Sequence, residues 1–157
     1  MAGDIFGKER AIVTLTSTGS SLTNSNGVAV GTDLDFRSAG NFAQDFQIQF
    51  ELLCQWATIT GIVNGTVIGD LYLVPKMDGT NLPDVDTTVN NGIPPTCYVG
   101  SFPCIKAPTA NTNMRFVSNL VTVLHPMLYT AYLVNRSGQT ITANWTMKAI
   151  SARGQYT

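Results

Sequence analysis

Few residues in this chain of 157 could perform acid–base or nucleophilic chemistry. The single histidine, His125, precedes Pro126 at the end of an expected strand, and this position favours a surface imidazole over a general base. The chain also lacks Gly-x-Ser-x-Gly, His-Glu-x-x-His and the glycine-rich phosphate loops. We therefore predict that the protein is not an enzyme, and we assign no catalytic residue.

Carboxylates are the next candidates, because a glycosidase needs only two of them. Glu51 and Asp70 are expected on strands as solvated groups rather than as a catalytic pair. Residues 78–86 are rich in oxygen ligands, but they lack the spacing and the terminal Glu of an EF-hand. Turns in which Asp and Asn bond their own backbone explain this composition better. We predict no cofactor and no metal, while calcium binding by residues 78–86 stays open as an alternative.

The cysteines indicate neither a zinc site nor a disulfide framework. Cys54, Cys97 and Cys104 are an odd number without Cys-x-x-Cys spacing. Cys54 lies on the apolar side of an expected strand, so we expect a buried thiol. Cys97 and Cys104 could pair across a bent loop, whereas a continuous strand would hold them too far apart.

Two segments alternate between apolar and polar residues with the period of a half-buried strand. Residues 46–56 place apolar side chains along one face over roughly 36 Å, and residues 141–149 repeat the pattern. Two such faces packed together form a sandwich. The expected core residues are Phe46, Ile48, Phe50, Leu52, Trp56, Trp145 and Met147.

The remaining pattern predicts an all-β fold with a single domain. Residues 1–10 form a short head, and residues 11–157 form a β-sandwich with long loops at 17–27 and 76–95. We expect about eight strands in a jelly roll or another Greek-key arrangement. The long strand is expected to continue through Ile62, residues 17–27 to bury little, and residues 128–134 to pair with 141–150 as a closing hairpin.

The composition indicates a protein that contacts other subunits. Charged residues make up 12% of the chain, about half the usual share, and the net charge is −1. Thr, Ser, Asn, Gln and Gly replace them, so copies repel one another weakly. A β domain with an uncharged polar surface is the alternative. The nine Lys and Arg residues form no cluster, which argues against nucleic acid. No apolar run or leader suggests a membrane, so we expect synthesis in a cytosol.

The long loop at residues 76–95 is the expected contact surface, because such loops are usually functional. Its candidate interface residues are Asn81, Leu82, Pro83, Asp84, Val85 and Asp86. If this is correct, a short Gly/Ser turn in place of residues 81–86 should leave the melting temperature nearly unchanged. Residues 1–26 are the next candidate, as an arm that lies over a neighbour.

Three stretches carry a family resemblance: residues 10–22, residues 70–75 with Asp78-Gly79-Thr80 and Pro83-Asp84, and residues 126–139 with 144–148. Together they resemble small virion structural proteins of tailed bacteriophages. The resemblance implies a β-sandwich carried in many copies, as a capsid decoration (cement) protein or as a head–tail or tail accessory. The implied location is the virion, assembled in the host bacterial cytoplasm, and no family active site transfers. The stretch 97–104 and the loop before it depart from the family pattern.

The expected partners are the protein itself, possibly as a cyclic trimer, and the major capsid or other virion proteins. A carbohydrate-binding module is the rival class. In that case exposed tyrosine rings would stack on sugars. The candidate residues are Tyr72, Tyr98, Tyr129 and Tyr132.

Overall fold

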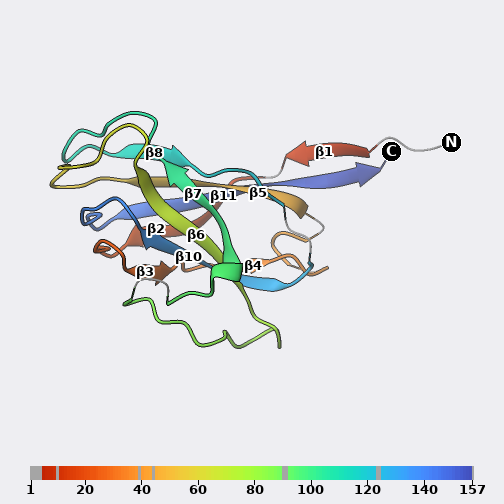
Figure 1. Ribbon diagram of the computed structural model, residues 1–157. Coiled ribbons are helices and arrows are strands. Elements are labelled where there is room, and N and C mark those ends of the chain that lie inside the picture. The colour runs from red at the N-terminus through yellow and green to blue at the C-terminus, as the bar shows by residue number, and fades with distance from the viewer. Residues whose placement is uncertain are drawn as a thin grey trace.

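A computed structural model describes residues 5–9, 11–38, 40–43, 45–89, 92–122 and 125–156. In these residues the protein is all-β, with eleven strands in two antiparallel sheets that pack face to face (Figure 1). The described part contains one short 3₁₀ turn, Pro95–Cys97, and no helix long and apolar enough to cross a membrane. The expected all-β sandwich is therefore confirmed.

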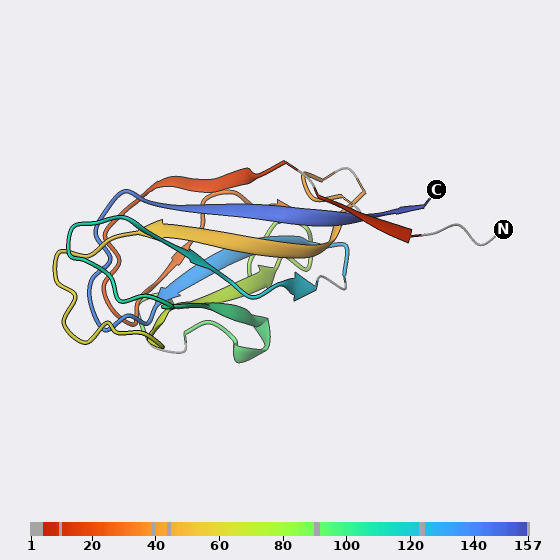
Figure 2. The same ribbon diagram turned by 90° about the horizontal axis from the view of Figure 1, so that it is seen from above.

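The first sheet has the strand order β2-β11-β5-β8. Strands β1 and β2 both pair with β11, at residues 152–156 and 145–149, while β9 pairs with the start of β5. The end of β11 and its partner β1 extend together past the other strands (Figure 2). The bounds are β1 Ile5–Glu9, β2 Val13–Gly19, β5 Asp45–Cys54, β8 Met114–Val117, β9 Val121–Thr122 and β11 Trp145–Tyr156.

The second sheet has the order β3-β10-β6-β7, with the short β4 also paired to β10. Its bounds are β3 Gly27–Ala29, β4 Leu34–Asp35, β6 Val67–Pro75, β7 Tyr98–Pro103 and β10 Leu128–Asn135. The two four-stranded orders together are those of a jelly roll, in which two Greek keys fold across two sheets.

The core between the sheets contains the two alternating segments that the sequence singled out. Both tryptophans are at most 2% exposed. Each indole N–H is satisfied, Trp56 Nε1 by Ser137 Oγ at 3.0 Å and Trp145 Nε1 by the Ser20 carbonyl at 2.8 Å. Gly19 permits the Trp145 position, because a Cβ there would lie 1.9 Å from the indole ring. Four other expected core residues are equally buried: Ile48, Phe50, Leu52 and Met147.

Phe46 is the exception, and its assignment to the core is wrong. Its exposed fraction is 37%, whereas the preceding Asp45 is buried and accepts a hydrogen bond from Ser151 Oγ. The register explains the difference, since Ala152 pairs with Gln47 but Arg153 pairs with Asp45. This β-bulge leaves Phe46 without a cross-strand partner and resets the alternation at that point.

The predicted closing hairpin is also wrong, because β10 and β11 belong to different sheets. The chain turns a corner at Asn135, which is 0% exposed. Its amide nitrogen donates to the carbonyls of Leu22 at 2.8 Å and Gln139 at 2.7 Å, and its oxygen accepts from Ser137. A side chain that satisfies the buried backbone in this way stabilises a crossing between sheets instead of a tight turn.

Three boundaries differ from the sequence-based expectation. Strand β5 ends at Cys54, and Trp56 makes only an isolated bridge to Ile141, so the long strand does not continue through Ile62. The segment 17–27 begins inside β2 and buries Leu22, which is 5% exposed and packs in the core. Part of the expected N-terminal head forms β1.

Candidate interaction surface

The long loop at residues 76–95 packs against its own domain. It runs along the outer face of the second sheet, below β10 in Figure 1. There Leu82 and Val85 contact a small second hydrophobic cluster, formed by Tyr72, Val74, Ile93, Tyr132 and Val134. The backbone is held as well, because Gly27 N–H donates to the Thr87 carbonyl at 2.7 Å. The domain itself therefore orders this part of the loop.

This packing divides the six candidate interface residues into two groups. Leu82 and Val85 are half-buried against the sheet. The other four are exposed: Asn81, Pro83, Asp84 and Asp86. Only the second group is available to a partner, so an interface at this loop would be polar and acidic.

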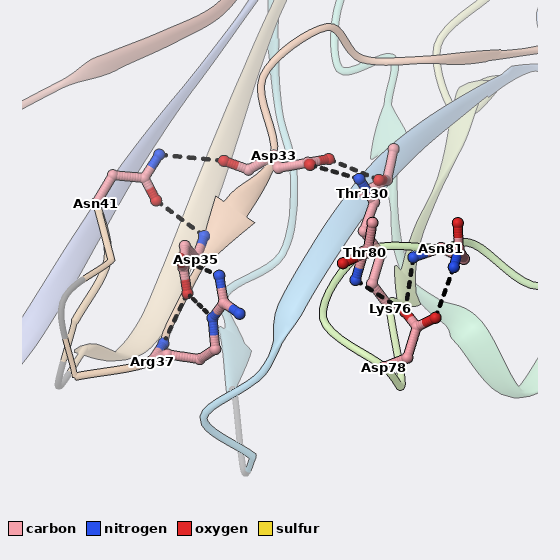
Figure 3. Close-up of polar contacts among 9 residues, drawn as sticks. All are labelled: Asp33, Asp35, Arg37, Asn41, Lys76, Asp78, Thr80, Asn81 and Thr130. Carbon is pink, nitrogen blue, oxygen red and sulfur yellow. Dashed lines mark hydrogen bonds and ion pairs between the residues drawn. The ribbon is translucent and has the colours of Figure 1, made fainter.

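A polar cluster fastens the beginning of the loop to the β3–β4 region (Figure 3). Asp33 accepts hydrogen bonds from Lys76 Nζ at 2.7 Å and from Thr130 Oγ1 at 2.6 Å. Asn41 donates to the Asp33 carbonyl at 3.1 Å and accepts from the Asp35 N–H at 2.8 Å. These bonds join three segments that are far apart in the sequence.

An ion pair continues the cluster toward the loop. Arg37 donates to both carboxylate oxygens of Asp35, at 2.8 and 2.7 Å. This hydrogen bonding lowers the pKa of Asp35 and raises the pKa of Arg37. The guanidinium lies beside Gly79, where a Cβ would come within 3.1 Å of it. The charges of this pair neutralise each other.

Two of the three carboxylates of the loop, Asp78 and Asp86, serve its turns. Asp78 accepts from the N–H groups of Thr80 at 2.8 Å and Asn81 at 2.6 Å, and these bonds lower its pKa. Asp86 accepts from the N–H and hydroxyl of Thr88, with the same effect on its pKa. Among the described residues, no three His, Cys, Asp or Glu side chains converge as metal ligands. The loop therefore uses its acidic oxygens as turn acceptors.

The residues considered for catalysis are separate from one another. Glu51 pairs with Arg115 at 2.8 Å on the first sheet, and Asp70 pairs with Arg136 at 2.7 Å on the second. The carbonyl of the exposed His125 accepts hydrogen bonds from the Met127 N–H at 2.9 Å and the Tyr129 hydroxyl at 3.3 Å. These contacts bring no nucleophile beside the imidazole.

The three thiols are free, so Cys97 and Cys104 do not form a disulfide. Burial raises the pKa of Cys54 strongly, and it also raises the pKa of Cys104. A nucleophilic cysteine needs the opposite shift. Neither buried thiol is therefore suited to nucleophilic attack.

The four tyrosines do not form a sugar-binding platform. Tyr72 and Tyr132 are buried beneath the long loop. Tyr129 is half-buried and packs edge-on against Phe36. Tyr98 is 47% exposed and makes an edge contact with Tyr72. A single exposed ring gives little area for stacking on a chain of sugars.

The structure places a second candidate surface on the outer face of the first sheet, which sequence reasoning missed. Ile12, Val117 and Leu120 are 63%, 47% and 52% exposed there. Ile12 and Val117 line a hollow of about 150 Å³, with Ile150 and Gln49 between them. The available signal was the outward side of the long strand, where Gln47 and Gln49 are polar but uncharged.

The fold is a jelly-roll sandwich in which the long loop covers the outer face of the second sheet, while the outer face of the first sheet exposes apolar side chains. No known family model and no curated protein matches the chain. One solved structure that resembles it in part is that of the infectious bursal disease virus Gx strain, with a TM-score of 0.29 and 10% sequence identity. That alignment covers 98% of this chain and 44% of the viral chain, so this chain spans less than half of the viral chain's length.

Proposed function

We propose that the protein is a non-enzymatic structural component of a virion. In the specific form of this proposal it is a decoration protein that binds the capsid of a tailed phage in many copies and stabilises it by subunit contacts. A head–tail or tail accessory protein is the alternative within the same class.

The observation that carries the proposal is the strand order of the two sheets, β2-β11-β5-β8 against β3-β10-β6-β7. Jelly rolls with this order are a common architecture of viral capsid proteins, although the fold also serves lectins and cupins. The sequence resemblance to small virion proteins points in the same direction and supplies the phage assignment.

The surface supports an assembling role within that fold. The charged fraction is 12% and the net charge is −1, so neighbouring copies would repel one another weakly. A shell protein that contacts a packaged genome carries a cluster of Lys and Arg, and the nine basic residues of this chain form no run along the sequence. This favours the outside of a shell over its genome-facing side.

The test is reconstitution on particles. Recombinant protein is added to particles of the virus that encodes this chain, prepared without its gene, and unbound protein is removed on a density gradient. Saturable co-sedimentation and a rise in the temperature at which the particles release their genome are expected. Particles that bind none of the protein, and whose thermal stability it does not change, would overturn the proposal.

A further inference from the structure

We propose that two copies of this chain pack through the outer faces of their first sheets, β2-β11-β5-β8, about a two-fold axis parallel to the strands. The inference rests on the self-association included in the proposed function, and it assigns the surface and the symmetry. A face-to-face contact of one surface with itself is isologous and closes as a dimer. We propose this dimer as an alternative to the expected cyclic trimer.

The other large surfaces of the described structure are less suited to self-association. The outer face of the second sheet lies under the long loop. Strand β2 is an edge with two register shifts, and such bulges discourage strand addition. Asn119 covers the edge of β7, because its amide donates to the Val99 carbonyl at 3.1 Å and accepts from the Ser101 N–H at 3.3 Å. The edge strand β3 has only three residues.

The proposed face has the composition of an interface core. Three aliphatic side chains, Ile12, Val117 and Leu120, project from it around the hollow and its neighbouring depression. Uncharged Gln47 and Gln49 lie between them. Interface centres are typically depleted in charge and rich in apolar contact. A free surface of this kind is commonly a contact site.

One pair of its charges, Lys148 and Glu51, is complementary to itself under the proposed symmetry, while Arg115 pairs with Glu51 within its own copy at 2.8 Å. Lys148 on β11 lies directly opposite Glu51 on β5, so the two residues are at the same height on adjacent strands. A two-fold axis that runs along the strands between β11 and β5 exchanges these positions. Lys148 of each copy then faces Glu51 of the other, twice per dimer. Since Ile12 and Val117 line opposite sides of one hollow, the same axis places Ile12 of one copy near Val117 of the other, about two residues apart along the strands.

The area is adequate for a stable pair. Strand β5 has ten residues, which span about 33 Å at about 3.3 Å per residue. Four rows of strands about 4.8 Å apart span about 19 Å, and because β2 has only seven residues and β8 with β9 only six, the flat area is about 500 Å². Side-chain relief brings the accessible surface near the roughly 800 Å² per partner of a standard interface.

The test is sedimentation velocity of the isolated protein over a concentration series, with a charge-swap pair. Wild type should dimerise. Lys148→Glu and Glu51→Lys should each weaken dimerisation at least about tenfold, because each creates two like-charged contacts. An equimolar mixture of the two variants should dimerise again, since in the heterodimer every facing pair is opposite in charge.

A matched apolar pair extends the test without altering that charge pair. Ile12→Asp should abolish dimerisation, whereas Val63→Asp, at a residue that is 59% exposed in a distant loop, should leave it unchanged. Melting temperatures of all variants establish that each is folded.

Three results would overturn the inference: a monomeric wild type, variants that dimerise as well as wild type, or singly weakened variants that fail to recover on mixing. A monomer that still binds particles would overturn the inference and leave the proposed function standing. A dimer that binds no particles would support the inference and contradict the proposed function.

Discussion

Truncation of the two loop side chains that face the second sheet should destabilise the whole domain. Leu82 and Val85 are half-buried against the cluster of Tyr72, Val74, Tyr132 and Val134. Full burial of such a side chain contributes about 1.5–3 kcal/mol, so half-burial contributes about 1 kcal/mol each. Partial exposure of the sheet beneath adds to this loss. The double variant Leu82→Ala/Val85→Ala should therefore lose about 2–3 kcal/mol of unfolding free energy.

The assay is urea unfolding followed by tryptophan fluorescence, with a thermal melt beside it. For a chain of this length, the expected loss lowers the melting temperature by roughly 5–10 °C. The control is Pro83→Ala/Asp84→Ala, at two exposed neighbours, which should change stability by less than about 0.5 kcal/mol. Equal effects of the two double variants would refute the assignment of the loop as a cover. The result also separates this account from the sequence-based expectation that residues 81–86 can be replaced at almost no cost.

Three further predictions concern the core, the corner and the turns. Trp145→Ala should cost about 3–5 kcal/mol, because the indole is 2% exposed and bonded to the Ser20 carbonyl; a shift of the urea midpoint worth less than about 1 kcal/mol would contradict its place in the core. Asn135→Ala should cost about 2–4 kcal/mol, since it removes one of the two donors to each of the Leu22 and Gln139 carbonyls and the acceptor of the Ser137 N–H; the same measurement on Asn24→Ala, at an exposed residue, should show a much smaller loss. The lowered pKa of Asp78 means that its stabilisation is present at neutral pH and is lost as the pH falls below about 4 through the folded-state value. Asp78→Asn should therefore be less stable at pH 7 but lose less stability than wild type between neutral and acidic pH, as followed by thermal melts; identical pH profiles would refute the role of this carboxylate.

The sequence alone was sufficient for the fold class because two long strands alternate between buried apolar residues and outward-facing residues. Residues 48–54 and 145–149 bury every second side chain, as a strand between a core and an outer face must. The tryptophans on those faces accordingly lie in the core. The second sheet gave a weaker signal, since β6 and β10 are covered on both faces and show nearly continuous apolar runs.

The errors arose where tertiary contacts override local pattern. The bulge at Phe46 depends on the buried Asp45 and its bond to Ser151, which no local rule predicts. The segment after Asn135 has the composition of a hairpin loop, but its direction depends on a distant carbonyl, that of Leu22. The loop over the second sheet carries its apolar residues without periodicity, so their common direction becomes visible only when the sheet is in place.

The candidate site was the least accessible to sequence reasoning. The sequence groups residues 81–86 into one candidate interface segment, although Leu82 and Val85 face the sheet and the other four are exposed. The outer face of the first sheet combines side chains from four separate segments of the chain. Such a patch is produced by strand order, and strand order cannot be read from the spacing of residues along the sequence.

The most direct test of a virion role is the copy number of this polypeptide in purified particles. Particles of the virus that encodes the chain are purified on successive density gradients, and the protein is quantified by mass spectrometry against its labelled recombinant form. A virion component should be present at a fixed, high ratio to the major shell protein that persists through each purification step. Absence from the particles, or a ratio that falls steadily with purification, would contradict it.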